Sequence, residues 1–178
     1  MNKKNIILIG MPASGKSTAG VVLAKVLGYD FIDSDLVIQK KAGKRLADII
    51  EKDGVEGFIR FEERINCSIL PGASEPAVIS TGGSAIYGAK AMEHFKEIGT
   101  VVYLKVPYDV LCSRLQDIKQ RGVVLKEGQT FEALFEERVV LYEKYADLII
   151  DEEGKTVEDI VAEIADSHEG NVSNHITF

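Results

Sequence analysis

The chain has 178 residues, of which 46% are hydrophobic and 28% are charged, values typical of one globular domain with a sizeable core. Its formal net charge of −7 argues against nucleic acid or an anionic membrane as the main partner, because both are themselves negative. The apolar run after Lys3 and Lys4 is too short for a signal peptide or a membrane span. Cys67 and Cys112 lie far apart without histidine companions, so they suggest no zinc site and favour reduced thiols in a cytoplasmic protein.

Short apolar runs alternate with segments of helical periodicity, which predicts a parallel sheet with right-handed crossovers. The expected strands cover 5–10, 30–33, 77–80, 100–105 and 148–151. The expected helices cover 16–27, 36–42, 46–52, 55–70, 89–98, 108–116, 131–145 and 157–167. Ligands of such sheets bind at the carboxyl ends of the strands, so the residues that follow each strand are the first candidates for a site.

The first strand leads into the sequence GMPASGKST, which fits the phosphate-binding loop pattern G-x-x-x-x-G-K-[ST]. Gly10 and Gly15 permit the turns that a ring of amides around a phosphate requires. Lys16 can reach the terminal phosphates, and the Ser17 hydroxyl can bind Mg²⁺. The other expected nucleotide-binding positions of the loop are Ala13, Ser14 and Thr18. A Gly- and Ser-rich turn in an ordinary βα unit is the alternative, but the strand–loop–helix context favours a nucleoside triphosphate site.

The second strand ends in two carboxylates, Asp33 and Asp35. Beside a phosphate loop, one of them can hold Mg²⁺ through water and the other can accept a proton from a substrate hydroxyl. The structural alternative is that Asp33 or Ser34 caps a helix that begins near Leu36. Both interpretations can hold at once.

The third strand is followed by Ser80-Thr81-Gly82-Gly83-Ser84. Glycines at the carboxyl end of a strand let a ligand approach the backbone closely, although an ordinary turn would have the same composition. The stretch 117–129 has three basic residues and little periodicity, and it indicates either a mobile loop or a plain surface connection.

Two charged residues fall inside apolar helical stripes. Arg138 lies on the stripe that includes Leu134 and Phe135, and Glu62 lies on the stripe that includes Phe58. Buried charges require partners. Glu62 and Arg138 therefore either pair with each other or face a polar pocket.

Taken in chain order, these motifs resemble the shikimate kinase family, which consists of small P-loop kinases of the nucleoside monophosphate kinase type. The resemblance extends from Asn5 to about Ile164 and rests on GMPASGKST, FIDSD, DGVEGFIRFEE, STGGSA, the pair Arg114 and Arg121, and ERVVLYEKYAD. It implies a three-layer α/β fold with a central parallel sheet of about five strands, a lid and substrate-binding helices. The implied single domain covers 1–168, with a lid at about 115–128, an acceptor-binding region at about 34–70, and a polar tail at 169–178.

The resemblance also implies roles for individual residues. Lys16, Asp35 and Arg121 would be catalytic, with Asp35 as the base for the acceptor hydroxyl. Arg114 and Arg121 would contact the nucleotide, and Ser17 and Asp33 would hold the metal. The implied acceptor-binding positions are Asp35, Ile59, Glu62, Gly82, Gly83, Ser84 and Arg138.

The implied activity is the ATP- and Mg²⁺-dependent phosphorylation of the shikimate 3-hydroxyl, a step of chorismate and aromatic amino-acid biosynthesis. We accordingly expect a cytoplasmic monomer whose partner is a small-molecule acceptor, with no nucleic acid and no membrane involved. Two other functions stay open. One is a related kinase for a different polyol or hydroxy acid, and the other is a nucleotide-binding module without efficient transfer.

Three residues depart from the family pattern, and two of them, Ile59 and Ser84, motivate the kinase for a different acceptor. Ile59 stands where the family has a carboxylate-binding arginine, Ser84 replaces the third glycine of GGG, and Gly122 replaces the proline of the lid motif. Loss of a charge-assisted partner would weaken acceptor binding on the order of ten- to a hundredfold. Arg60, the next residue, is about 100° around the helix from Ile59.

Overall fold

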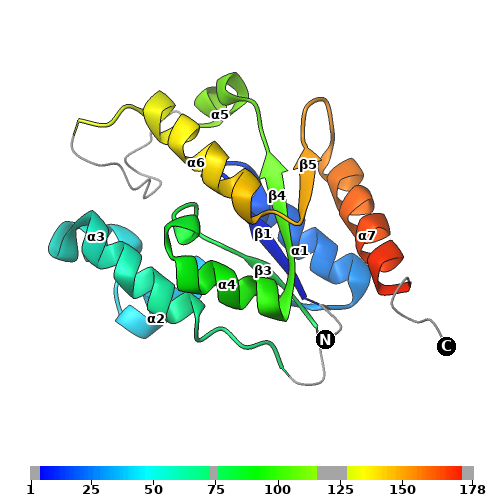
Figure 1. The fold of residues 1–178 in the computed structure, drawn as a ribbon, viewed down its shortest axis with the longest axis horizontal. Helices are drawn as coiled ribbons and strands as arrows, with labels where there is room; N and C mark the ends of the chain where they lie inside the picture. The colour runs from blue at the N-terminus through cyan, green and yellow to red at the C-terminus, as the bar shows by residue number, and fades with distance from the viewer. Residues whose placement is uncertain (1–4, 73–75, 116–127, 174–178) are drawn as a thin grey trace.

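The computed structural model describes residues 5–72, 76–115 and 128–173. Its centre is a parallel sheet of five strands in the order β2-β3-β1-β4-β5 (Figure 1), which confirms the predicted α/β fold. The strands are β1 (Asn5–Ile9), β2 (Asp30–Asp33), β3 (Ala77–Ser80), β4 (Gly99–Lys105) and β5 (Leu148–Asp151). Leu8 of the central strand pairs with Ser80 on one side and Val102 on the other, so the strand ends that carry the candidate motifs lie at one edge of the sheet.

Within the described ranges the helices agree with the predicted ones in number and order, when the two helical segments that meet at the kink in α3 are counted separately. They are α1 (Lys16–Leu27), α2 (Ser34–Ala42), α3 (Leu46–Asn66), α4 (Ala89–Ile98), α5 (Tyr108–Arg114), α6 (Phe131–Tyr145) and α7 (Val157–Ser173), with a 3₁₀ turn at Ala85–Tyr87. α3 consists of two helical segments that meet at a kink at Gly54, which agrees with the two helices predicted at 46–52 and 55–70, but the second segment ends at Asn66 instead of residue 70. α7 continues to Ser173, six residues beyond its predicted end.

The kink in α3 and the longer α7 both have physical causes. α3 contains a non-helical residue, Gly54, at φ 70° and ψ 173°, where the chain bends and resumes the helix instead of forming a loop. α7 passes through Gly170 and Asn171, which are poor helix formers. Extending an existing helix by a turn requires no new nucleation, so such residues do not end it.

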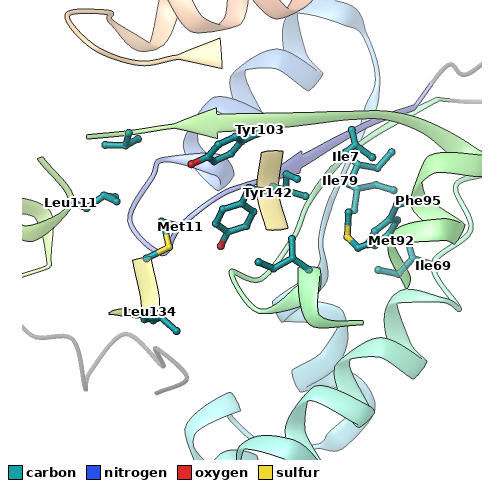
Figure 2. Packing of buried hydrophobic residues seen from close by; sticks show 14 of the residues in the cluster. Ile7, Met11, Ile69, Ile79, Met92, Phe95, Tyr103, Leu111, Leu134 and Tyr142 are labelled. Atoms are coloured by element: carbon teal, nitrogen blue, oxygen red, sulfur yellow. The ribbon is translucent and has the colours of Figure 1, made fainter. Parts of the chain in front are cut away.

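Side chains of β1 alternate between two cores, as a strand buried on both faces requires. Ile7 and Ile9 join α4 and α6 on one face, whereas Ile6 and Leu8 join α1 and α7 on the other. Figure 2 shows the first core, in which the rings of Tyr103 and Tyr142 stack with centroids 5.0 Å apart. The result is three layers of helix, sheet and helix.

α2 and α3 lie together at one side of the molecule (Figure 1) and share a smaller apolar cluster of their own. That cluster includes Ile38, Ile49 and Phe58. Glu62 is buried on α3 together with Phe58. No helix in the described ranges is long and apolar enough to cross a membrane.

Candidate active site

The loop between β1 and α1 has the backbone that its glycines predict. Gly10 has φ 150°, and a Cβ there would lie 2.8 Å from the carbonyl oxygen of Leu104, so only glycine fits without a shift. Gly15 and Ala13 have positive φ angles of 85° and 64°. The alanine is uncommon in this region, and such strain concentrates at ligand-binding segments.

Lys16 is buried beneath this loop. Its Nζ donates to the carbonyl oxygens of Gly10 and Met11 at 2.8 Å each, and to Ser14 Oγ at 3.3 Å. Burial lowers the pKa of Lys16 to about 8, and the nearby carboxylate of Asp35 opposes that change. A phosphate beside Nζ would favour the charged form.

Asp33 and Ser17 place two side-chain oxygens next to each other. Ser17 Oγ lies 3.1 Å from Asp33 Oδ2 and 3.2 Å from Ser80 Oγ. Within the described ranges no three His, Cys, Asp or Glu side chains form a metal cluster. This composition fits Mg²⁺, which proteins commonly hold with one or two carboxylates while waters and substrate phosphates complete the shell.

A second group of site residues surrounds Asp35. Burial and the neighbouring Asp33 raise the pKa of Asp35 to about 6, while Lys16 opposes the rise. A Cβ at Gly82 would lie 2.6 Å from both Asp35 Oδ1 and Glu62 Oε1. A side chain at position 82 would therefore displace both carboxyl groups, which explains the glycine.

Glu62 is 1% exposed, which confirms the expected burial. It accepts a hydrogen bond from Ser84 Oγ at 2.6 Å, and its Oε1 has no hydrogen-bond partner. Arg138 lies near enough to lower the pKa of Glu62, but burial dominates and raises that pKa to about 8. Glu62 therefore bonds to Ser84 and not to Arg138. Pairing with Arg138 was one of the two alternatives left by the sequence.

Arg138 is also 1% exposed. Its Nε donates to Tyr87 Oη at 3.3 Å, and its guanidinium lies 5.4 Å from the centre of the Tyr87 ring. A Cβ at Gly83 would lie 3.0 Å from Arg138 Nη1, so the guanidinium lies directly behind the glycine pair. Tyr142, one helical turn after Arg138, donates to the Gly83 carbonyl at 2.7 Å and fixes this loop.

A cavity of about 470 Å³ lies between the phosphate loop and these groups. Its walls are formed by the phosphate loop, by α2 and α3, and by the segment after β3. The lining residues are Pro12, Ala13, Gly15, Lys16, Ser17, Thr18, Asp35, Leu46, Phe58, Thr81, Gly82, Gly83 and Ser84. The structure thus brings Lys16, Ser17 and Asp35 to one space, as expected for a phosphate donor next to an acceptor.

A second cavity, of about 440 Å³, lies on the opposite flank of the loop. Arg114 lines it and donates to the carbonyl oxygen of Ala13 at 3.2 Å. Val157 and Ile160 form an apolar part of its wall. This combination suits a nucleoside whose phosphates lie in the loop.

Some predicted site residues in the described ranges line neither cavity, namely Gly10, Asp33, Ile59, Glu62 and Arg138. Ile59 is half-buried and lines neither of them, whereas its neighbour Phe58 lines the first. Arg60 is exposed and pairs with Glu56 at 3.7 Å, so it does not replace a cation at position 59. Arg121 and most of the predicted lid lie outside the described residues.

Sequence reasoning missed Thr81 and Glu152. Thr81 donates through both N and Oγ1 to the Leu8 carbonyl, at 3.1 and 2.9 Å, and holds the glycine segment against β1. Glu152 follows β5 directly and lies 3.5 Å from Arg114. The rule that ligands gather after strand ends would have found both residues.

The chain is similar to known proteins in both sequence and structure. The family model described as shikimate kinase matches residues 12–169. A shikimate kinase of Persephonella marina is 37% identical over 161 residues, covering 90% of this chain and 96% of that protein. The solved shikimate kinase of Acinetobacter baumannii in complex with shikimate superposes with a TM-score of 0.82 at 32% identity, covering 98% and 96%. That of Aquifex aeolicus superposes with a TM-score of 0.77 at 35% identity, covering 94% and 97%.

Proposed function

This chain belongs to the shikimate kinase family, and we propose that it transfers the γ-phosphoryl group of ATP to the 3-hydroxyl of shikimate. The observation that carries the proposal is the single cavity lined by Lys16 and Ser17 of the phosphate loop, by Asp35, and by the glycine pair. A donor and an acceptor bound there would meet without an intermediate carrier. Family membership further supports a cytoplasmic protein that acts on a small molecule, and we propose that it is a monomer.

The residues of the cavity have different roles in the proposed reaction. As the acceptor oxygen bonds to the γ-phosphorus, the bond to the bridging oxygen of ADP breaks and the hydroxyl proton passes to Asp35. A pKa of about 6 suits Asp35 to accept this proton near neutral pH. Lys16 stabilises negative charge on the phosphates, and most of the rate enhancement in such transfers comes from positioning and electrostatics.

Mg²⁺ fits the oxygen pair of Ser17 and Asp33, where it would neutralise charge on the β- and γ-phosphates. Arg114 belongs to the nucleotide side. We assign the acceptor side to residues 34–70, together with Gly82, Gly83 and Arg138. The remaining assignments, the lid at 115–128 and Arg121 within it, rest on the family resemblance.

The Ser84–Glu62 hydrogen bond favours a second candidate, a kinase of the same kind for another hydroxylated acceptor. Ser84 occupies volume beside the acceptor cavity, and Ile59 supplies no cation for an acceptor carboxylate. Arg138 is then the described arginine nearest the glycine pair. An acceptor with a different anionic group, or with none, would fit such a site.

A coupled assay of ADP release with shikimate, quinate, gluconate and glycerate separates these functions. We expect turnover with shikimate and little with the others. Turnover with another alcohol alone would select the second candidate, and ADP binding without acceptor-dependent turnover would leave only a nucleotide-binding module.

Replacement of the proposed base tests the mechanism in the same assay. Asp35→Asn should lower kcat by about 100-fold or more, because general base catalysis commonly contributes that much, and it should leave ADP binding intact. Asp30→Asn is the matched control, since Asp30 is exposed at the start of the same strand. Equal kcat values in both variants would show that Asp35 is not the base.

A further inference from the structure

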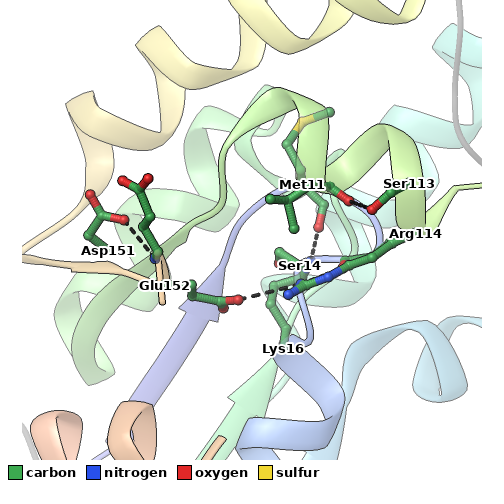
Figure 3. Close-up of polar contacts among 10 residues, drawn as sticks. Met11, Ser14, Lys16, Ser113, Arg114, Asp151 and Glu152 are labelled. Carbon is green, nitrogen blue, oxygen red and sulfur yellow. Dashed lines mark hydrogen bonds and ion pairs between the residues drawn. The ribbon is translucent and has the colours of Figure 1, made fainter. Parts of the chain in front are cut away.

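Glu152 is the first residue after β5, and its backbone is held on both sides. Its N–H donates to the Lys105 carbonyl at 2.9 Å, and its own carbonyl accepts from the N–H of Lys155 at 3.1 Å. The side chain points toward Arg114 at the end of α5, and Glu152 Oε2 lies 3.5 Å from Arg114 Nη1 (Figure 3). The same Nη1 donates to the Ala13 carbonyl of the phosphate loop.

The two partners differ in burial. The Glu152 side chain is 5% exposed, whereas that of Arg114 is 42% exposed. A buried carboxylate on a fixed backbone is a rigid anchor, and a half-exposed arginine without such an anchor samples many rotamers. Glu152 therefore restrains the position of the Arg114 guanidinium, and not the reverse.

Both residues line the second cavity, together with Ala13 and Gly15 of the loop. We propose that Glu152 is a positioning residue for the nucleotide, which holds the Arg114 guanidinium against the Ala13 carbonyl so that it forms one wall of the nucleoside cavity. The proposal rests on the proposed use of ATP. It adds that nucleoside binding, as distinct from phosphate binding, depends on a carboxylate that itself need not touch the ligand.

The charges around Glu152 allow a competing explanation. Lys16 and Arg114 both act on its carboxylate, as does Asp151 with the opposite sign. Glu152 could then serve only to offset positive charge near the phosphates. Its removal would in that case strengthen anion binding, whereas removal of a positioning residue weakens nucleoside binding.

Calorimetric titration with ADP and with inorganic tripolyphosphate separates the two explanations. For Glu152→Gln we expect the Kd for ADP to rise on the order of tenfold, the usual effect of losing a charge-assisted partner, with the Kd for tripolyphosphate nearly unchanged. Glu152→Asp keeps the charge but shortens the side chain, and it should also weaken ADP. Glu153→Gln is the control, because Glu153 is the exposed neighbour and its loss should change neither constant.

A double-mutant cycle with Arg114→Met shows whether Glu152 acts through Arg114. The double variant should bind ADP no more weakly than Arg114→Met alone, since the effects of coupled residues do not add. Additive losses, unchanged or tighter ADP binding in Glu152→Gln, or an equal loss for tripolyphosphate would each overturn the proposal. A wild-type protein that binds no ADP would instead refute the proposed function.

Discussion

Asp33 uses its two carboxylate oxygens for different purposes. Oδ1 accepts from the backbone N–H groups of Asp35 and Leu36 at 3.0 and 3.2 Å and so caps α2, while Oδ2 faces Ser17. The capping and metal-binding interpretations of FIDSD are therefore compatible in one side chain. The cap also starts α2 two residues earlier than predicted, which places Asp35 in the first helical turn.

Glu62 should make stability depend on pH. Burial raises the pKa of Glu62 to about 8 from an ordinary value of 4.5, so the folded state keeps a proton that the unfolded state loses. The stabilisation from Glu62 is complete below about pH 4.5 and is lost as the pH rises through 8. Glu62→Gln stays neutral and keeps an acceptor for Ser84.

Urea denaturation at pH 5.5 and 8.5 measures this effect. Wild type should lose more free energy of unfolding over that interval than Glu62→Gln, by an amount on the order of a few kcal/mol at most. Asp35 contributes in the same direction, but it is present in both proteins and cancels in the comparison. Parallel pH dependences would contradict a raised pKa at Glu62.

At the scale of elements, α3 determines the shape of the acceptor side. Its first part carries Leu46 and its second part carries Phe58 and Glu62, and the bend at Gly54 sets the angle between them. The sequence predicts two helices here because Asp53-Gly54 interrupts the periodicity. The structure has two helical segments here that meet at a kink, because a single glycine in a non-helical conformation accommodates the bend between them.

Gly54→Ala should therefore destabilise the protein. A φ of 70° with ψ 173° is a region that essentially only glycine occupies, and a side chain forced into it costs about 1–3 kcal/mol. Chemical denaturation measures the loss, and Lys52→Ala, an exposed change two residues earlier, is the control. An unchanged or increased stability of Gly54→Ala would show that α3 can straighten.

At the scale of the whole molecule, the phosphate loop lies between two cavities on a chain of net charge −7. Long-range attraction does not bring anionic ligands to such a protein. Binding must come from local groups, namely the loop amides, the buried Lys16 and the placed arginines. Ligand binding to these groups should therefore increase the free energy of unfolding of the whole protein.

Saturation with Mg²⁺ and ADP at about 100 times Kd should stabilise the fold by about 2.7 kcal/mol and raise Tm by roughly 5–10 °C for a chain of this length. Lys16→Met should lose most of that shift at the same ADP concentration, because it removes the cation beneath the loop. Lys25→Met removes an exposed lysine of the same helix and should keep the full shift. Thermal unfolding with and without ligand gives the answer, and equal shifts in the two variants would exclude Lys16 from nucleotide binding.

The sequence by itself determined the parallel α/β fold, the phosphate loop, and the burial of Glu62 and Arg138. Each follows from local rules, namely strand–helix alternation, glycine positions and the helical spacing of apolar residues. Only the tertiary structure decided that Glu62 bonds to Ser84, that Ile59 lies outside the cavity while Phe58 lines it, and that Glu152 reaches Arg114. These contacts join residues 22 and 38 positions apart. Their geometry depends on how α3 and β5 pack against the rest of the chain, which local periodicity does not specify.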